Sequence, residues 1–380
     1  MTGPPAGPPG PVVAVLGGGQ LGRMLGLAGI PLGLDFRFLD PSPGATAQAV
    51  GPVQVAALDD EAAAGVLATG AQVVTWEWEG IPAATARAAA VHAPVRPDPG
   101  ALEVAQDRLL EKTTFERLGI AVPGFAAVDD RAGLDAAVDR LGLPAVLKTR
   151  RGGYDGKGQQ VLRQADELDP AWSALGGVPL ILEELIPFRR ELAVLAVRGL
   201  GGETACYPLV ETEHAGGVLR ACRAPAPWIE EDCQEDGFAI ATQLLTELDY
   251  VGLLTVELFD RDGQLVANEF APRVHNSGHW TIEGSVTSQF ENHLRAILGW
   301  PLGATTGRGH SGLVNALGAL PDRDQVLAIE GAHLHDYRKA AKPGRKVGHV
   351  TVTADTAESR DRRLAAVRAV VESTPSPTST

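Results

Sequence analysis

The sequence predicts a protein of mixed α/β and α+β class with two or three domains, and three observations lead to this prediction. The chain has 380 residues, which is too long for one small core because domains typically have about 100 to 200 residues. Short apolar strands alternate with helical segments between residues 12 and 77, a pattern typical of a parallel, doubly wound sheet. Further along, pairs of apolar strands are joined by glycine-containing loops, which indicates hairpins.

The first domain is expected at residues 11–107. Its strands are the runs VVAVL, FRFLD, VQVAA and AQVVTWE, and a glycine turn with a helix and an alanine-rich helix lie between them. Alternation of this kind implies parallel pairing. The opening residues 1–10 and the last residues 373–380, STPSPTST, are expected to be disordered tails because of their composition.

A second unit is expected at residues 108–198 and a third at residues 199–372. A helix from about Asp107 to Leu118 bridges the first two units and ends at Gly119, a usual stop signal. The second unit has strands at 144–149 and 158–163 whose connecting loop is expected to move as a lid. In the third unit, strands at 204–210 and 251–259 flank an amphipathic helix at 229–248.

Composition restricts the partners of the chain. The net charge of −14 argues against broad binding to nucleic acid or to anionic membranes, since both need a basic face. No window approaches the roughly 20 apolar residues of a membrane helix, and the first residues do not resemble a secretory signal. Three cysteines without a C-x-x-C pair favour reduced thiols. We therefore expect a cytoplasmic protein with no nucleic-acid or membrane partner.

The run 17-GGGQLG-22 follows the first strand and matches the G-x-G-x-x-G pattern of dinucleotide-binding loops, with Asp40 at the end of the second strand. The pattern alone favours a dehydrogenase only weakly, because free backbone N–H groups at a helix N-terminus bind any phosphate or carboxylate. Nothing later in the sequence supplies hydride chemistry. Two interpretations remain open: the loop binds an organic phosphate substrate, or it only turns the chain.

The stretch 148-KTRRGGYDGKGQQ-160 is a basic, glycine-rich loop that follows an apolar strand. Its glycines let the backbone approach phosphate oxygens, and Lys148 adds a point charge at the end of the strand. The stretch does not match the G-x-x-x-x-G-K-[ST] pattern of a P-loop. We expect it to cover a polyphosphate; the alternative is a plain basic hairpin tip.

Glu257 and Glu269 each interrupt an apolar strand, and a buried carboxylate is unfavourable unless it is paired or binds a metal. The turn at 262–263, Asp-Gly, predicts a hairpin. A two-residue loop places Glu257 opposite Asn268, whereas a three-residue loop or a bulge places it opposite Glu269. Shared binding of Mg²⁺ therefore predicts the longer loop or a bulge. The alternative is that both glutamates face water.

The segment 271-APRVHNSGHWT-281 is dense in polar groups. Arg273 offers a two-pronged donor for a planar anion such as bicarbonate, and His275 and Asn276 add hydrogen-bonding groups. The alternative is that Arg273 pairs with nearby glutamates.

The segment 343-PGRKVGH-349, with Lys339 before it, places Arg345 and Lys346 in a turn. Such a turn suits a phosphate monoester, and an exposed basic turn is the alternative.

Taken in order, RRGGYDGKGQ, NEFAPRVHNSGHWT and PGRKVGH are highly specific motifs, and GGGQLGRM before them is moderately specific. Together they resemble the N5-carboxyaminoimidazole ribonucleotide synthases, ATP-grasp enzymes of purine synthesis, over about residues 12 to 352. The resemblance implies a three-domain ATP-grasp fold, with a doubly wound pre-ATP-grasp domain, a mobile lid and a C-terminal α+β domain. It also implies carboxylation of 5-aminoimidazole ribonucleotide by ATP and bicarbonate through carboxyphosphate, with Mg²⁺ or alternatively Mn²⁺, in a homodimer.

The resemblance further assigns site residues. The nucleotide set is Arg108, Lys148, Gly153, Tyr154, Asp155, Gly156, Lys157, Gly158, Gln159, Glu183, Glu184, Leu185, Ile186, Glu191, His214, Asn268 and Glu269. The set for the aminoimidazole ribonucleotide is Gln20, Leu21, Glu77, Glu79, Tyr154, Asp155, Lys157, Lys339, Arg345 and Lys346. The metal ligands are Glu257 and Glu269, and the catalytic set is Lys148, Arg273, His275 and Asn276. The chain departs from the family pattern at Trp76 and Trp78, where Tyr and Phe are expected, and at Lys157, where Arg is common.

Three other functions remain open from the sequence. They are another ATP-grasp ligase that uses formate or carboxylates biotin, a dehydrogenase built on residues 17–22, and a catalytically silent nucleotide sensor. ADP release that depends on bicarbonate, binding of NAD(H), and dispensability of Glu257 or Glu269 would separate them.

Overall fold

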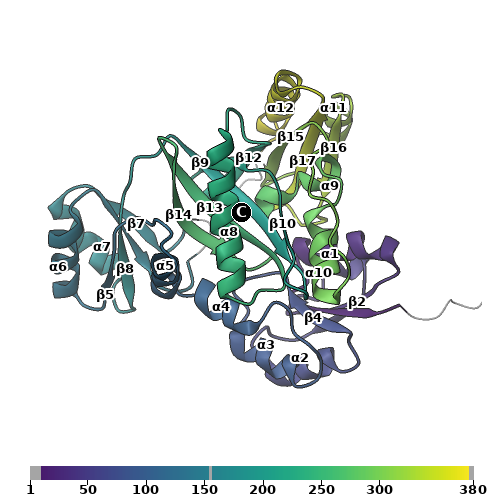
Figure 1. Ribbon diagram of the computed structural model, residues 1–380, viewed down its shortest axis with the longest axis horizontal. Helices are drawn as coiled ribbons and strands as arrows, with labels where there is room; N and C mark the ends of the chain where they lie inside the picture. The colour runs from purple at the N-terminus through teal and green to yellow at the C-terminus, as the bar shows by residue number, and fades with distance from the viewer. Residues whose placement is uncertain (1–9, 154–155, 376–380) are drawn as a thin grey trace, which may run out of the picture.

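The computed structural model describes residues 10–153 and 156–375, and the chain forms three sheets (Figure 1). The predicted tails fall mostly outside these ranges. In Figure 1 the large sheet lies in the middle, the small sheet with α6 and α7 lies at the left, and the N-terminal sheet lies below.

The N-terminal sheet is parallel throughout, as the sequence predicts, with the strand order β3-β2-β1-β4. Its strands are β1 (Val12–Leu16), β2 (Asp35–Asp40), β3 (Val53–Val55) and β4 (Val73–Trp76). Its helices are α1 (Gln20–Gly29), η1 (Ile30–Leu32), η2 (Thr46–Ala49), α2 (Glu61–Ala68), α3 (Ala83–Ala90) and α4 (Pro99–Ala105). The carboxyl ends of β1 and β4 therefore meet at one edge, next to the start of α1.

The small sheet is antiparallel with the order β5-β8-β6-β7, and the predicted hairpin of residues 144–163 is confirmed by the pairing of β6 with β7. Its strands are β5 (Phe125–Val128), β6 (Ala145–Thr149), β7 (Gln159–Leu162) and β8 (Leu180–Glu184). Its helices are α6 (Arg131–Leu141), η3 (Ala165–Glu167) and α7 (Leu168–Leu175). The predicted bridging helix is α5 (Arg108–Arg117), whose first amides are capped by Asp107.

The large sheet follows the order β14-β13-β9-β11-β12-β15-β17-β16, with β10 beside β9, and all its pairs are antiparallel. Its strands are β9 (Arg190–Arg198), β10 (Thr204–Cys206), β11 (Val210–Ala215), β12 (Val218–Ala224), β13 (Gly252–Arg261), β14 (Gln264–Ala271), β15 (His310–Leu317), β16 (Ala332–Asp336) and β17 (Lys346–Ala354). Its helices are α8 (Glu231–Glu247), η4 (Asn276–Gly278), α9 (Thr281–Gly284), α10 (Gln289–Leu298), α11 (Arg323–Leu327) and α12 (Ala357–Glu372). Strand β9 lies in this sheet although the expected second unit included it; the expected domain limits stay predictions.

Strand β9 shows why these elements assemble as they do. Alternate side chains of a strand face opposite sides of a sheet. Leu192, Val194 and Ala196 pack into the core with α8 and α5, and Leu195 and Val197 pack into the core with α10 and α1. Because both faces are covered, the strand reads as the nearly continuous apolar run ELAVLAV.

The N-terminal domain is fixed to the large sheet by this shared core and by buried polar contacts. Trp76 donates its indole N–H to the carbonyl of Pro272 (2.9 Å), and Thr75 Oγ1 lies 3.0 Å from His293 Nε2. The end of β4 is thereby held against the segment that follows β14. None of the helices in the described ranges combines the length and the apolar character needed to cross a membrane.

Candidate functional site

The two acidic residues of the β13–β14 hairpin lie at paired positions. The turn has two residues, because Arg261 pairs with Gln264, and both turn residues have positive φ, 54° at Asp262 and 92° at Gly263. An Asp-Gly turn accommodates this conformation easily. The register then shifts after Glu257, so that Glu257 pairs with Glu269 while Leu258 pairs with Ala267. Shared metal binding predicted either a longer loop or a bulge, and the structure has the bulge, with Asn268 as the extra residue. Glu257 is half-buried, whereas Glu269 is exposed.

A buried lysine holds the bulge. Lys112, on α5, is 1% exposed, and its ammonium group donates to the carbonyl of Asn268 at 2.5 Å. The same group lies 3.2 Å from Glu183 Oε2 on β8, and Lys148 Nζ on β6 donates to that oxygen at 2.9 Å. This lysine pair with Glu183, which we call the Lys112–Glu183–Lys148 cluster, joins the small sheet, α5 and the large sheet.

The cluster sets the charge of Glu183. Burial alone would raise the pKa of Glu183, but the charges of Lys112 and Lys148 outweigh it and hold this pKa at about 2. The neighbouring Glu111 is the opposite case. Burial, and then the charge of Glu269, raise the pKa of Glu111 to about 8, and its carboxyl group accepts the N–H of Phe270 at 2.6 Å.

Glu257 stands at the centre of a second polar group. Burial, followed by the charge of Glu269, raises the pKa of Glu257 to about 7. His275 Nε2 lies 3.4 Å from Glu257 Oε1, and burial with the charge of Arg273 holds the pKa of His275 well below its ordinary value. His275 is therefore a neutral hydrogen-bonding group at pH 7. On the other side, His214 Nδ1 lies 2.7 Å from Glu191 Oε2.

The basic glycine loop lies over this region. Arg108 donates to the carbonyls of Thr149 (2.8 Å) and Gly153 (3.2 Å), and Arg150 and Arg151 both pair with Asp107 at the start of α5. These contacts fix the start of the loop to α5. Tyr154 and Asp155 lie outside the described residues.

The far side of the loop touches the β11–β12 turn. Gly156 has a φ of +76°, and a Cβ atom there would lie 2.9 Å from the carbonyl oxygen of Gly216. Gly216 follows β11, the strand that carries His214, and the charge of His214 acts on Glu257. The loop therefore reaches the turn next to the group around Glu257. Gly158 and Gln159 continue into β7, where Gln159 pairs with Lys148, and Lys157 forms contacts of its own.

The first glycine motif holds one of the chain's own carboxylates. Glu77, which follows β4, accepts the N–H groups of Gly19 (2.5 Å) and Gly22 (2.7 Å) at the start of α1. A Cβ atom at position 19 would lie only 2.4 Å from this carboxylate, which explains the glycine. Asp40 accepts the N–H of Gly18 at 2.9 Å. The side chains of Glu77 and Asp40 thus accept these three amides in this conformation. The interpretation of the loop as a phosphate site stays a prediction.

Arg273 pairs with a glutamate, but from another domain than expected. Its Nε donates to Glu79, and its Nη1 donates to the carbonyl of Val274 at 2.9 Å. Burial alone would raise the pKa of Glu79, and Arg273 outweighs it and lowers this pKa. The pair links the end of the N-terminal sheet to the segment after β14, beside Glu257.

The remaining basic residues gather near the same edge. Lys339 donates to the side-chain oxygen of Gln20, and burial lowers the pKa of Lys339. Lys346 begins β17 instead of lying within a turn, which corrects the sequence prediction for it. Its charge acts on both Glu79 and Glu257. Arg345 donates to the carbonyl of Ala340 at 3.3 Å.

The remaining predicted site residues are held either by hydrogen bonds of their side chains or backbone or by burial in the core. Asn276 and Asn315 exchange hydrogen bonds of 2.8 and 3.1 Å. The side chain of Leu21 is buried in the core, so only its backbone is available to a ligand. Glu184 ends β8, and its N–H and that of Leu185 donate to the carbonyls of Gly124 and Pro144, respectively. Ile186 is buried just beyond.

Lys112, Glu111 and Asn315 are polar residues of the site that the sequence prediction missed. A signal existed for Lys112, which lies three residues before the buried Phe115 and so on the inner face of α5. Partners 70 or more residues away, such as Glu183, cannot be read from the spacing.

Three family models match the chain in order. They are the ribonucleotide synthetase pre-ATP-grasp domain at residues 11–106, the ATP-grasp domain at 113–290 and the phosphoribosylaminoimidazole carboxylase C-terminal domain at 311–363. The N5-carboxyaminoimidazole ribonucleotide synthase of Pseudomonas aeruginosa is 49% identical over 360 residues, which are 95% of this chain and 99% of that protein. This chain belongs to the N5-carboxyaminoimidazole ribonucleotide synthase family.

Solved structures agree with membership in the N5-carboxyaminoimidazole ribonucleotide synthase family. The synthetase from Thermus thermophilus has a TM-score of 0.92 and 52% identity, with 96% of this chain and all of that chain (100%) covered. The Aspergillus clavatus synthase, solved with ADP and 5-aminoimidazole ribonucleotide, has a TM-score of 0.89 and 31% identity, with 96% and 99% covered. The three-domain ATP-grasp fold implied by the sequence is confirmed, and the dehydrogenase interpretation is excluded by the family.

Proposed function

We propose that this chain carboxylates 5-aminoimidazole ribonucleotide to N5-carboxyaminoimidazole ribonucleotide, with ATP and bicarbonate as co-substrates. The observation that supports this most directly is the acidic pair Glu257–Glu269, placed by the bulge beside the glycine loop and the Lys112–Glu183–Lys148 cluster. Family membership and the relative solved with ADP and the aminoimidazole ribonucleotide support the choice of substrates.

ATP would lie between the small and the large sheet. Lys148, on β6, and Arg108, which donates to the loop carbonyl of Gly153, would contact the phosphates. Gly153 to Gln159 would cover the phosphates with backbone N–H groups. The carboxylate of Glu191 would accept hydrogen bonds from the ribose hydroxyls. His214 Nδ1, which lies 2.7 Å from Glu191 Oε2, would hold this carboxylate in place. The adenine would meet the segment 183–186 at the end of β8.

The acidic pair fits a divalent cation. Glu257 and Glu269 supply oxygen donors, and burial, followed by the charge of Glu269, raises the pKa of Glu257. Among the described residues, no set of three or more His, Cys, Asp or Glu side chains is arranged to hold a metal alone. We therefore propose Mg²⁺, which usually keeps few protein ligands and completes its shell with phosphate oxygens and water. When bound, it would neutralise charge on the triphosphate.

The reaction then needs two bond exchanges. A bicarbonate oxygen attacks the γ-phosphorus, the bond to ADP breaks, and Lys148 stabilises the charge that develops on the phosphoryl group. The carboxyphosphate formed breaks its C–O bond to phosphate beside the substrate amine, whose nitrogen forms the new bond to carbon. The released phosphate accepts the amine proton, so no side-chain base is needed. Neutral His275, together with Arg273 and Asn276, would hold the carboxyl group.

Water must be kept out while carboxyphosphate exists. The contact of Gly156 with Gly216 supports a closed position of the loop over the site.

On the substrate side, the aminoimidazole ribonucleotide would be bound by Gln20, Glu77, Lys339 and Arg345. Cytoplasmic location and a homodimer stay predictions from composition and from the family.

The decisive experiment is ADP release by the purified protein with each co-substrate withheld in turn. We expect release to need both bicarbonate and the aminoimidazole ribonucleotide. Release that depends on formate or biotin instead would contradict the proposal. Full activity of Glu257→Gln and Glu269→Gln would contradict the metal assignment alone.

A further inference from the structure

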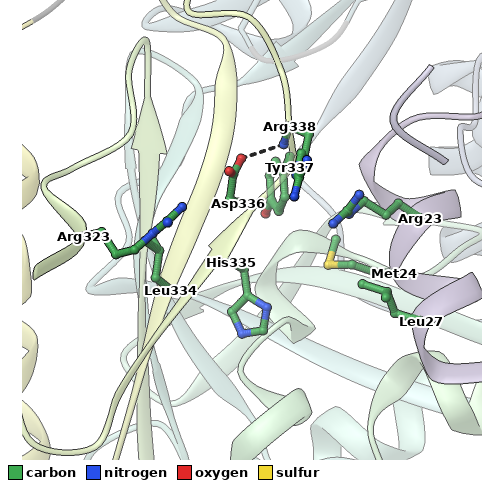
Figure 2. A pocket seen from close by; sticks show the side chains of 9 residues that line it. All are labelled: Arg23, Met24, Leu27, Arg323, Leu334, His335, Asp336, Tyr337 and Arg338. Carbon is green, nitrogen blue, oxygen red and sulfur yellow. Dashed lines mark hydrogen bonds between the residues drawn. The ribbon is translucent and has the colours of Figure 1, made fainter. Parts of the chain in front are cut away.

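A cavity of about 260 Å³ lies outside the residues assigned to the substrates, between α1 and β16. Figure 2 shows its lining: Arg23 from α1, Arg338 beyond the end of β16, and Arg323 from α11. Met24 and Leu27 on α1 provide an apolar wall. The cavity is therefore small, basic on several sides and apolar on one.

The three guanidinium groups are not neutralised within the part of the chain that the structure describes. None of Arg23, Arg323 and Arg338 has a side-chain ion pair or hydrogen bond there. Asp336 is the one carboxylate in the lining, and it accepts the backbone N–H of Arg338 at 2.6 Å. In a chain with a net charge of −14, most arginines of the described ranges meet a carboxylate or a carbonyl, whereas these three line one cavity without such a partner. Arg23 is half-buried, and Arg323 and Arg338 are exposed to solvent, so all three can turn toward an anion.

The backbone conformation of Arg338 is a second unusual feature of the cavity. Its φ is +57°, in the left-handed region that side chains other than glycine rarely adopt. Such a residue is strained, and the hydrogen bond from its backbone N–H to Asp336 supports this conformation. Figure 2 shows the side chains of Arg338 and Arg23 on the same side of β16.

The geometry points to a binding site for a small phosphorylated anion in this cavity. Each guanidinium group can donate two parallel hydrogen bonds to a phosphate, and three such groups around one space match a tetrahedral dianion better than a single planar carboxylate. The volume exceeds that of a bare phosphate, so Met24 and Leu27 would contact the organic part of the ligand. Its affinity should fall as salt is added.

The cavity also adjoins the proposed substrate site. Arg23 lies three residues from Gln20 on α1, and Arg338 precedes Lys339, which donates to Gln20. An anion in the cavity would thus contact the same helix and loop that present Gln20 and Lys339. This coupling, unlike the binding itself, rests on the proposed function.

Calorimetric titration of the whole 380-residue chain with inorganic phosphate and with ribose 5-phosphate, at low ionic strength, tests the site. We expect Arg323→Gln to weaken one binding event about tenfold, and Arg338→Gln to weaken the same event. Arg345→Gln should affect only the proposed substrate site, and Arg261→Gln, an exposed arginine at the β13–β14 turn, should affect neither. Ribose alone should not bind in the cavity.

Unchanged phosphate titrations for Arg323→Gln and Arg338→Gln would overturn the proposal. So would a change of oligomeric state in these variants with unchanged phosphate affinity, because the arginines would then face a second copy of the chain. Ribose 5-phosphate also competes with the aminoimidazole ribonucleotide at the proposed substrate site, which raises the apparent KM equally in the wild type and in Arg323→Gln. Coupling predicts a further change of this KM in the wild type that is absent from Arg323→Gln. Failure of the proposed function would show separately, as absence of bicarbonate-dependent ADP release.

Discussion

Lys112 is the residue on which two halves of the proposed nucleotide site depend. Its ammonium group bridges the bulge carbonyl of Asn268 and the carboxylate of Glu183, so it orients the acidic pair and Lys148 together. It is a positioning residue, because none of the three proposed substrates is assigned to it. A buried lysine without these partners would be unfavourable, since burial of an unpaired charge is costly.

We expect Lys112→Met to raise the KM for ATP about tenfold or more and to lower the free energy of unfolding by about 3 kcal/mol, because it leaves a buried pair broken. Steady-state kinetics and urea denaturation measure the two effects. Arg117→Met is the matched control on α5, where an exposed pair with Glu247 is lost and less than about 1 kcal/mol should change. If Lys112→Met has the same free energy of unfolding and the same KM for ATP as the wild type, Lys112 does not position the acidic pair or Lys148.

The depressed pKa of Glu183 predicts a dependence of stability on pH. This pKa is about 2 in the folded chain, against an ordinary value of 4.5 for a glutamate side chain, so the unfolded chain binds the proton more tightly. The stabilisation by the ionised form, up to about 3 kcal/mol, is complete above about pH 5 and is lost as the pH falls toward 2. Denaturation of wild type and Glu183→Gln from pH 6 to pH 2.5 should show a difference that shrinks with acid. A difference independent of pH would argue against the pairing.

At the scale of elements, the contact between two turns governs closure of the glycine loop. Gly152 and Gly156 both have positive φ, 78° and 76°, but only Gly156 faces the β11–β12 turn; nothing lies within 4 Å of a Cβ atom at Gly152. Alanine at either position adds similar backbone strain. Alanine at 156 adds a clash with Gly216 as well.

Gly156→Ala should therefore lower kcat by at least tenfold relative to Gly152→Ala, and it should raise the fraction of ATP hydrolysed without carboxylation because water enters. Measured ADP and carboxylated product give this ratio. Equal kinetics of the two variants would indicate that the turn contact plays no part in catalysis.

The hairpin of β13 and β14 shows what the sequence could and could not predict. The Asp-Gly turn was sufficient to predict the hairpin, because local chemistry decides it. The two acids in apolar strands predicted a longer loop or a bulge on the condition that they share a metal ion, and the structure has the bulge. The partner of the 17–22 loop was not predictable. Glu77 is 58 residues from Gly19, and the pattern of glycines is the same whether a phosphate or a carboxylate fills it. Lys346 was misplaced since a glycine-containing turn gives no sign of where the next strand begins.

At the scale of the whole molecule, the proposed nucleotide site lies where α5, the small sheet and the large sheet meet, so its ligand should stabilise the assembled chain. Mass action predicts a rise in Tm when ADP and Mg²⁺ are added together. EDTA should abolish most of this rise, and Glu269→Gln should show little of it. Glu235→Gln, an exposed glutamate on α8, should respond like the wild type. The same rise with ADP in EDTA would argue against a metal at this pair.

The carboxylate of Glu77 has a consequence for substrate choice. A helix N-terminus normally attracts anions, but here the carboxyl group of Glu77 already accepts the N–H groups of Gly19 and Gly22 at the start of α1. In the proposed substrate site, an incoming phosphate ester would find its counter-charge on Lys339 and Arg345, which belong to later segments of the chain. If these residues form the site as proposed, binding of the ribonucleotide needs the N-terminal and C-terminal segments together, and an isolated N-terminal domain would not bind it.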